Sequence, residues 1–194
     1  MNHTETESVA FEAGERVYHE VYGVLQVAGW TNHTYATKSI AALKLTRLDG
    51  TTITLPRTQL QSSETRLHQL DQFANARDME QALQIVARPP AIRLRGKYGS
   101  IPGVDEKMTA GVQGIAELVR DLNHEEEHTF ATCRDLSRVA NRLRELLAFY
   151  WQCEVCEAGD KLNQHLRTHG RPQLDFIPLG ADGRSWNQRV PQAM

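Results

Sequence analysis

Residues 43–56, LKLTRLDGTTITLP, set the fold of the first part of the chain. Apolar and polar side chains alternate before Asp49-Gly50, with Leu43 and Leu45 on one face, and they alternate again over 51–55. Both residues of Asp49-Gly50 tolerate a positive φ and favour a two-residue hairpin turn. Pro56 ends the second run because it cannot continue a paired strand. The stretch therefore predicts a β-hairpin.

Strand-like runs continue back to Phe11, whereas helical spacing begins near residue 75. Asp78 is the expected N-cap of a first helix, Val112 opens the clearest one, and Thr132 is expected to cap a long one. A short last helix would hold Leu162 and Leu166. We predict an α+β chain with a small β-sheet or partly closed barrel followed by an all-helical domain. The expected divisions are a disordered N-terminus at 1–10, the β-domain at 11–70, the helical domain at 76–168 and an extended tail at 170–194.

Composition is that of an ordinary globular protein. The chain has 194 residues, of which 40% are hydrophobic and 24% charged, and its net charge is −2. This balance excludes disorder throughout the chain and lacks the basic excess of autonomous nucleic-acid binders. No apolar run reaches the roughly 20 residues of a membrane span, and the polar start predicts no secretory signal. Three cysteines are too few for a disulfide framework, so we expect a cytoplasmic protein with no membrane association.

His124, Glu125 and His128 match the H-E-x-x-H spacing. On a helix, this spacing directs two imidazoles at one zinc ion, and the glutamate activates a bound water. Two further glutamates lie between the histidines, whereas a buried peptidase helix favours uncharged residues there. Glu145 is a candidate third ligand. The segment is interpreted either as an acidic surface patch or as a metallopeptidase site.

Cys153, Cys156, His165 and His169 have the ligand types and outer spacings of a structural zinc module. The central spacer is shorter than the usual spacer of about 12 residues. Alternatively, the two thiols continue the buried face of a helix. A redox Cys-x-x-Cys site is less favoured because glutamates flank both thiols. We expect no cofactor, with zinc as the alternative.

A basic segment follows Pro89-Pro90 and is the candidate DNA contact. Cations neutralise phosphates and release counterions, and an aromatic ring can stack on an exposed base. The ordinary alternative is a solvated loop. The chain lacks phosphate-loop, dinucleotide-binding and serine-nucleophile motifs, so we expect a binding protein without catalytic activity. The candidate residues are Arg88, Arg93, Arg95, Lys97 and Tyr98.

Several segments, taken in order, resemble the CarD/CdnL family of bacterial transcription regulators. Residues 11–24, FEAGERVYHEVYGV, are similar to the start of that family, and Leu55-Pro56 is similar to the end of a strand in it. Residues 65–67, TRL, and 87–90, ARPP, are similar to two later segments. The most specific match is residues 115–122, IAELVRDL. The resemblance covers roughly residues 11–157.

This resemblance implies a Tudor-like N-terminal domain that docks on the RNA polymerase β subunit by adding strand to strand. It also implies a helical domain that lies on promoter DNA near the upstream edge of the melted bubble. An exposed sheet edge is a template for such pairing. We expect a cytoplasmic monomer that modulates initiation. By position, the polymerase-binding edge would include His33, Thr34, Ile53, Thr54 and Leu55.

The chain departs from the family in three places. Residues 94–98 lack the tryptophan of the DNA-facing helix, residues 124–128 are acidic where the family is basic, and Thr54 stands where the edge strand carries a basic residue. Three hypotheses follow: a transcription regulator that contacts DNA, a polymerase-binding adaptor without a DNA role, and a zinc-dependent protein.

Overall fold

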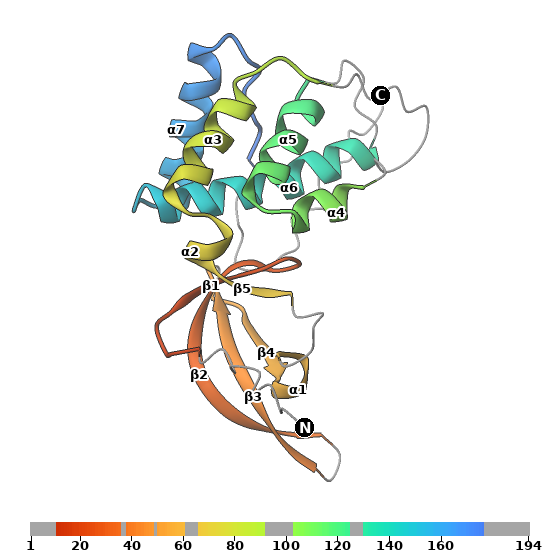
Figure 1. The fold of residues 1–194 in the computed structure, drawn as a ribbon, viewed down its shortest axis with the longest axis vertical. Coiled ribbons are helices and arrows are strands. Elements are labelled where there is room, and N and C mark those ends of the chain that lie inside the picture. Colours follow the sequence, from red (N-terminus) through yellow and green to blue (C-terminus); the bar gives the residue numbers. More distant parts are fainter. Residues whose placement is uncertain are drawn as a thin grey trace, which may run out of the picture. The chain divides into compact units, whose positions relative to one another are not determined.

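The structure is a computed structural model that describes residues 11–35, 38–48, 50–60, 66–91, 103–124 and 130–176. The chain divides into two compact units, Met1–Leu70 and Asp71–Met194. The described residues form one antiparallel five-stranded sheet and seven helices, so the chain has mixed α and β content (Figure 1). The predicted segment 1–10 lies outside the described residues.

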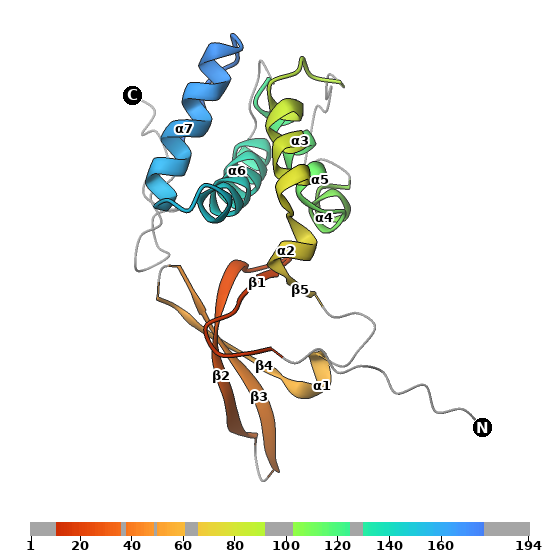
Figure 2. The same ribbon diagram turned by 60° about the vertical axis from the view of Figure 1, so that its left-hand side comes forward.

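The first unit is built on the sheet. Its strands lie in the order β4-β3-β2-β1-β5, and every neighbouring pair is antiparallel. Strands β4 and β5 form its two edges, so the sheet is open and not closed into a barrel. Figure 2 shows β2 and β3 as a long, curved ribbon. The elements are β1 (Arg16–His19), β2 (Gly23–Tyr35), β3 (Lys38–Arg47), β4 (Thr52–Pro56), α1 (Arg57–Leu60) and β5 (Leu67–Gln69).

The core of this unit lies on one face of the sheet. Leu43 pairs with Leu55 and Leu45 with Ile53, so the alternating residues of the predicted hairpin share that face. Ile53 and Leu55 are only partly buried because they lie on the edge strand. The buried members of the core are Phe11, Val17, Leu25, Val27, Leu43, Leu45 and Leu67.

The predicted hairpin is present, but its turn is longer than the two-residue type. Arg47 N donates to Thr51 O at 2.8 Å, and Gly50 N donates to Arg47 O at 3.0 Å. Gly50 has φ +82°. These bonds define a three-residue connection with a glycine in the left-handed region, which brings Leu48 into the turn. Glycine is needed there because other residues are strained at such a φ.

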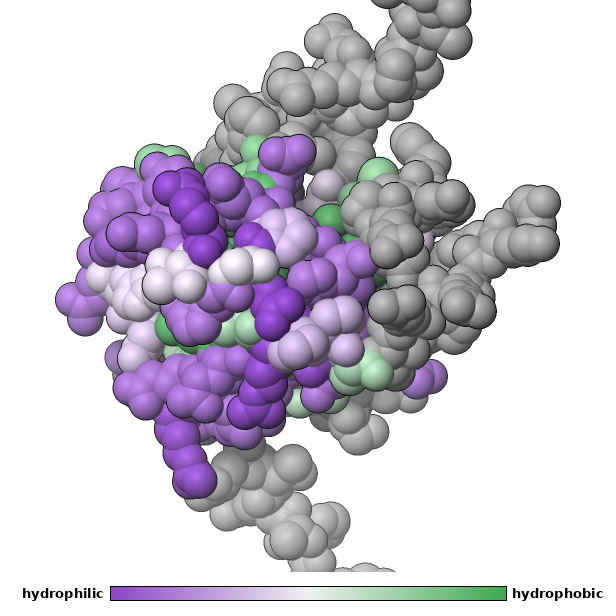
Figure 3. All heavy atoms as spheres, turned by 90° about the horizontal axis from the view of Figure 1, so that it is seen from above, coloured by the Kyte–Doolittle hydropathy of each residue, from purple (hydrophilic) through white to green (hydrophobic). Residues whose placement is uncertain are grey.

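The second unit is helical. Its buried apolar residues recur at helical spacing, as in α5, where Ile115, Leu118, Val119 and Leu122 are all buried. On the face seen in Figure 3, hydrophilic side chains predominate among the described residues, with small apolar spots between them. The helices are α2 (Leu70–Phe73), which begins at the division between the units, α3 (Ala76–Val86), α4 (Val104–Thr109), α5 (Val112–Leu122), α6 (Phe130–Tyr150) and α7 (Val155–Thr168).

Two predicted helix starts are wrong. Helix α3 is capped by Asn75, whose side chain accepts a hydrogen bond from Asp78 N at 3.0 Å, so Asp78 lies inside the first turn. Asn75 is itself a strong N-cap residue, and its amide also donates to the Asp78 carboxylate at 2.6 Å. Helix α6 begins at Phe130, two residues before the predicted cap Thr132.

Gly114 permits the close approach of α4 and α5. A Cβ atom built on Gly114 would lie 2.1 Å from the backbone oxygen of Lys107. This distance is far inside van der Waals contact, so any larger residue at 114 would push the two helices apart.

Part of the predicted tail is packed onto the helices. Gly170, at φ +65°, lies in the turn that ends α7, and residues 171–176 have no regular secondary structure. Leu174 is nevertheless buried and forms two backbone hydrogen bonds with the Asn163 side chain, at 2.7 and 3.0 Å. Asn123 donates to Pro172 O at 2.8 Å, and Arg171 donates to Ala87 O at 2.9 Å. Residues 177–194 lie outside the described residues.

Candidate functional site

Strand β4 offers an open backbone edge. Within the described residues it pairs only with β3, from Thr46↔Thr52 to Ala42↔Pro56. Its sequence explains its place: the β-branched residues favour a strand, and Pro56 cannot donate a ladder hydrogen bond. An edge strand with one unpaired side can accept a further strand.

The register shows which backbone groups face outward. Arg47 N donates to Thr51 O, so these two residues form a hydrogen-bonded pair at the start of the ladder. Hydrogen-bonded and non-hydrogen-bonded pairs alternate along an antiparallel ladder, so Ile53 and Leu55 direct their N–H and C=O groups toward β3. Thr52 and Thr54 therefore direct theirs toward the open side. Pro56 falls on the outward set, where its missing N–H breaks no bond to β3.

A second set of bonds supports this assignment. Val27 N donates to Glu15 O and Val27 O accepts from Gly14 N, both at 2.8 Å, so the backbone of Val27 turns away from β3. Its partner Leu45 must then direct its own groups toward β4, where it lies opposite Ile53. The outward N–H and C=O of Thr54 have no partner among the described residues.

The two faces of the edge differ in character. Ile53 and Leu55 pack against the core, while Thr54 lies opposite the exposed Lys44 on the other face. A strand added to β4 would therefore extend a sheet with one apolar and one polar face.

The structure separates the two predicted polymerase-binding segments. His33 and Thr34 lie on β2, opposite Ile40 and Ser39, and β3 lies between β2 and β4. Strand β4 covers β3 only from Ala42 to Thr46, so His33 and Thr34 do not share its edge. The sequence does not reveal this separation because it gives no sign that β2 extends nine residues beyond its pairing with β1.

Of the predicted DNA-binding residues, Arg88 is described: it follows α3, is exposed, and donates its backbone N–H to Ile85 O at 3.1 Å. The remaining candidates, Arg93, Arg95, Lys97 and Tyr98, lie outside the described residues.

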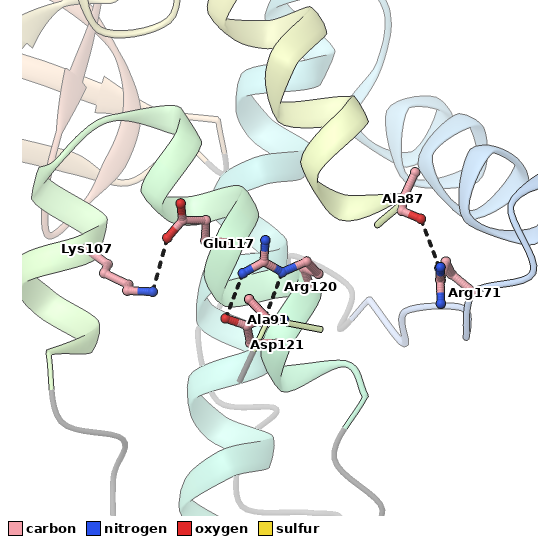
Figure 4. A network of polar contacts seen from close by, with 7 residues as sticks. All are labelled: Ala87, Ala91, Lys107, Glu117, Arg120, Asp121 and Arg171. Atoms are coloured by element: carbon pink, nitrogen blue, oxygen red, sulfur yellow. Dashed lines mark hydrogen bonds and ion pairs between the residues drawn. The ribbon is translucent and has the colours of Figure 1, made fainter. Parts of the chain in front are cut away.

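A polar network that the sequence reasoning missed holds the chain on either side of Arg88 (Figure 4). Asp121 accepts from Ala91 N at 3.1 Å, and its two oxygens accept from Arg120 at 2.7 and 3.0 Å. The hydrogen bond to Asp121 raises the pKa of Arg120. Arg171 binds the Ala87 carbonyl. The sequence signal for this network was an acidic residue, Asp121, among the apolar buried positions of α5, directly after a basic residue.

The predicted H-E-x-x-H residues are described only in part. His124 is half-buried just after α5. Burial lowers the pKa of its imidazole, and the positive charge of Arg171 lowers it further. Glu125 and His128 lie outside the described residues. The candidate third ligand Glu145 is buried and forms an ion pair with Arg142 at 3.0 Å.

The four residues of the predicted zinc module are not brought together. Cys156 and His165 both lie on α7, nine positions apart, which is about 13 Å along a helix axis. His165 Nε2 contacts Leu83 O at 3.0 Å, and His169 Nδ1 contacts His165 O at 2.9 Å. Neither Cys153, which precedes α7, nor Cys156 forms a disulfide. No group of three or more metal-ligating residues occurs in the described part of the chain.

None of the described helices combines the length and the apolar character needed to cross a membrane. The sequence matches no family model and no curated protein.

Proposed function

We propose that this chain is a transcription regulator that docks on the RNA polymerase β subunit through the outer edge of β4. The single observation that carries the proposal is the orientation of Thr54, whose N–H and C=O face the open side of an edge strand. Main-chain hydrogen bonds to an added strand supply affinity, and the alternating side chains supply specificity. The sequence resemblance to CarD/CdnL regulators supplies the partner.

The proposal also assigns a role to each of the two units. The first unit is a Tudor-like domain, and the helical unit acts near promoter DNA once polymerase has bound. A protein with a net charge of −2 gains little affinity from phosphates alone, so tethering by polymerase must supply the effective concentration of DNA. The proposed activity is binding and involves no catalysis.

Substitution of Thr54 by Pro tests the docking mode. Proline removes the outward N–H but no bond to β3, so Thr54→Pro should keep the wild-type melting temperature and lose polymerase binding at least tenfold. Thr54→Val keeps the backbone donor and should bind normally, and Thr54→Arg should bind equally or more tightly. Binding of each full-length variant to core RNA polymerase is measured by biolayer interferometry. Wild-type affinity for a folded Thr54→Pro variant would overturn the proposal.

The adaptor without a DNA role is the second candidate, favoured by the acidic segment at 124–128. Arg93→Ala and Arg95→Ala decide between the two. If DNA is contacted, these variants shorten the lifetime of the open promoter complex at unchanged polymerase affinity. If neither changes that lifetime, the adaptor function holds.

A further inference from the structure

The segment that contains the open edge carries a local charge opposite in sign to that of the whole chain, with its cations on β3 and α1, on either side of β4 in the sequence. Residues 23–60, which form β2 to α1, contain four basic residues and a single acidic one, a net charge of +3, whereas the chain carries −2. Lys44 and Arg57 are exposed. Electrostatic complementarity accelerates encounter and selects partners, so this edge favours an acidic partner.

Arg57 lies beside that edge and contacts an aromatic ring. It directly follows Pro56, the last residue of β4, and its guanidinium lies over the Trp30 ring, 5.9 Å from the ring centroid. Trp30 pairs with Leu43, and Leu43 pairs with Leu55, so the three residues form one cross-strand row on the apolar face of the sheet. Trp30 remains 48% exposed.

This arrangement is suited to carboxylate recognition. A guanidinium that lies over an aromatic ring loses less freedom on binding, and its planar fork donates two parallel hydrogen bonds to a carboxylate. Tryptophan and arginine are also the residues most enriched at energetic centres of interfaces.

We propose that β4 recognises an extended acidic segment of its partner, and that a carboxylate of this segment binds Arg57 on the Trp30 ring. The inference rests on the proposed docking function and adds the chemistry of the partner strand. An added antiparallel strand hydrogen-bonds to Thr52 and Thr54, so its residues opposite Ile53 and Leu55 face the apolar side. The partner strand therefore carries apolar residues at those two positions and an acidic residue at the next same-face position, beside Arg57.

The test compares full-length variants for binding to core RNA polymerase at about 50 and about 200 mM salt. Arg57→Ala should weaken binding about tenfold, Arg57→Glu more, and Arg57→Lys less than Arg57→Ala. Trp30→Ala should weaken binding about fivefold in the wild-type background. In the Arg57→Ala background the same substitution should weaken binding by a smaller factor, because the two residues act together. Arg77→Glu, an exposed cation on α3, is the charge-matched control and should change binding less than twofold.

The outcomes separate the two proposals. If Arg57→Glu binds like the wild type while Thr54→Pro does not bind, carboxylate recognition is wrong and strand addition stands. Equal losses for Arg57→Glu and Arg77→Glu would reduce the effect to net charge and overturn the inference. If the wild-type chain has no measurable affinity for polymerase, the docking function itself is wrong and this inference fails with it.

Discussion

Replacement of Asp121 by Ala should lower the free energy of unfolding of the helical unit more than a surface substitution does. The Asp121 carboxylate is 4% exposed and the Arg120 side chain 10%, and they share two hydrogen bonds of 2.7 and 3.0 Å. Asp121→Ala removes this pair and also leaves Ala91 N without its acceptor. The variant keeps a largely buried guanidinium that has lost its hydrogen-bonded counter-ion, with Glu117 as the remaining acidic neighbour.

The expected cost follows from that geometry. Breaking a buried ion pair by removing one partner costs about 3–5 kcal/mol. The Arg120 side chain retains some exposure, so we expect about 3 kcal/mol, a large part of the 5–15 kcal/mol typical of a domain. For a unit of this size, the loss lowers the melting temperature by about 10 °C.

Urea unfolding followed by circular dichroism measures this loss. The double variant Arg120→Ala, Asp121→Ala should recover at least about 1 kcal/mol because it no longer buries an unpaired charge. Glu117→Ala is the matched control: its ion pair with Lys107 is 3.1 Å long but about 40% exposed, so its loss should cost under about 1 kcal/mol. An Asp121→Ala variant as stable as Glu117→Ala would refute the reasoning.

Three further predictions concern the helical unit. Gly114→Ala should cost about 1–3 kcal/mol in urea unfolding, because its Cβ would overlap the Lys107 carbonyl; an unchanged unfolding midpoint would contradict the close helix approach. Asn75→Ala should cost about 1 kcal/mol by the same assay, whereas Asn75→Ser should cost less, because it keeps the cap acceptor without placing a second carboxylate beside Asp78. Burial and the charge of Arg171 lower the pKa of His124, so the unfolded chain binds a proton at this histidine more readily, and the free energy of unfolding falls as the pH drops below about 6.5. His124→Gln should therefore lose less of its urea midpoint between about pH 7.5 and about pH 5.5 than the wild type does. An identical loss in both proteins would contradict this.

The elements that follow from local pattern were predicted well. The alternation around Leu43, Leu45 and Ile53 identified the β3–β4 hairpin and its buried face, and the helical spacing from Ile115 identified α5. These signals are short-range, so one sequence is enough to reveal them.

The missed elements are short or depend on contacts between separate segments of the chain. Strand β5 has three residues and is defined by pairing with β1, about fifty positions earlier. Helix α4 is too short to show a full apolar stripe. Leu174 is buried because the Asn163 side chain binds its backbone, which the composition of the tail does not show.

The same distinction applies to the candidate site. Periodicity indicated which face of β4 is apolar, but the outward direction of the Thr54 N–H follows from the Arg47–Thr51 bond. The cation–π contact joins Trp30, on β2, to Arg57, the residue that follows β4, and β3 lies between these two strands in the sheet. Neither the arginine at 57 nor the tryptophan at 30 indicates this contact in the sequence.

Amide hydrogen exchange in the presence of core RNA polymerase tests the central claim most directly. The amides of Ile53 and Leu55 bond to β3 and should be protected in the free chain, whereas those of Thr52 and Thr54 should exchange rapidly. Strand addition predicts that saturating polymerase slows exchange at Thr52 and Thr54 by at least tenfold and changes Ile53 and Leu55 little. Unchanged rapid exchange at Thr52 and Thr54 in a saturated complex would contradict docking through β4.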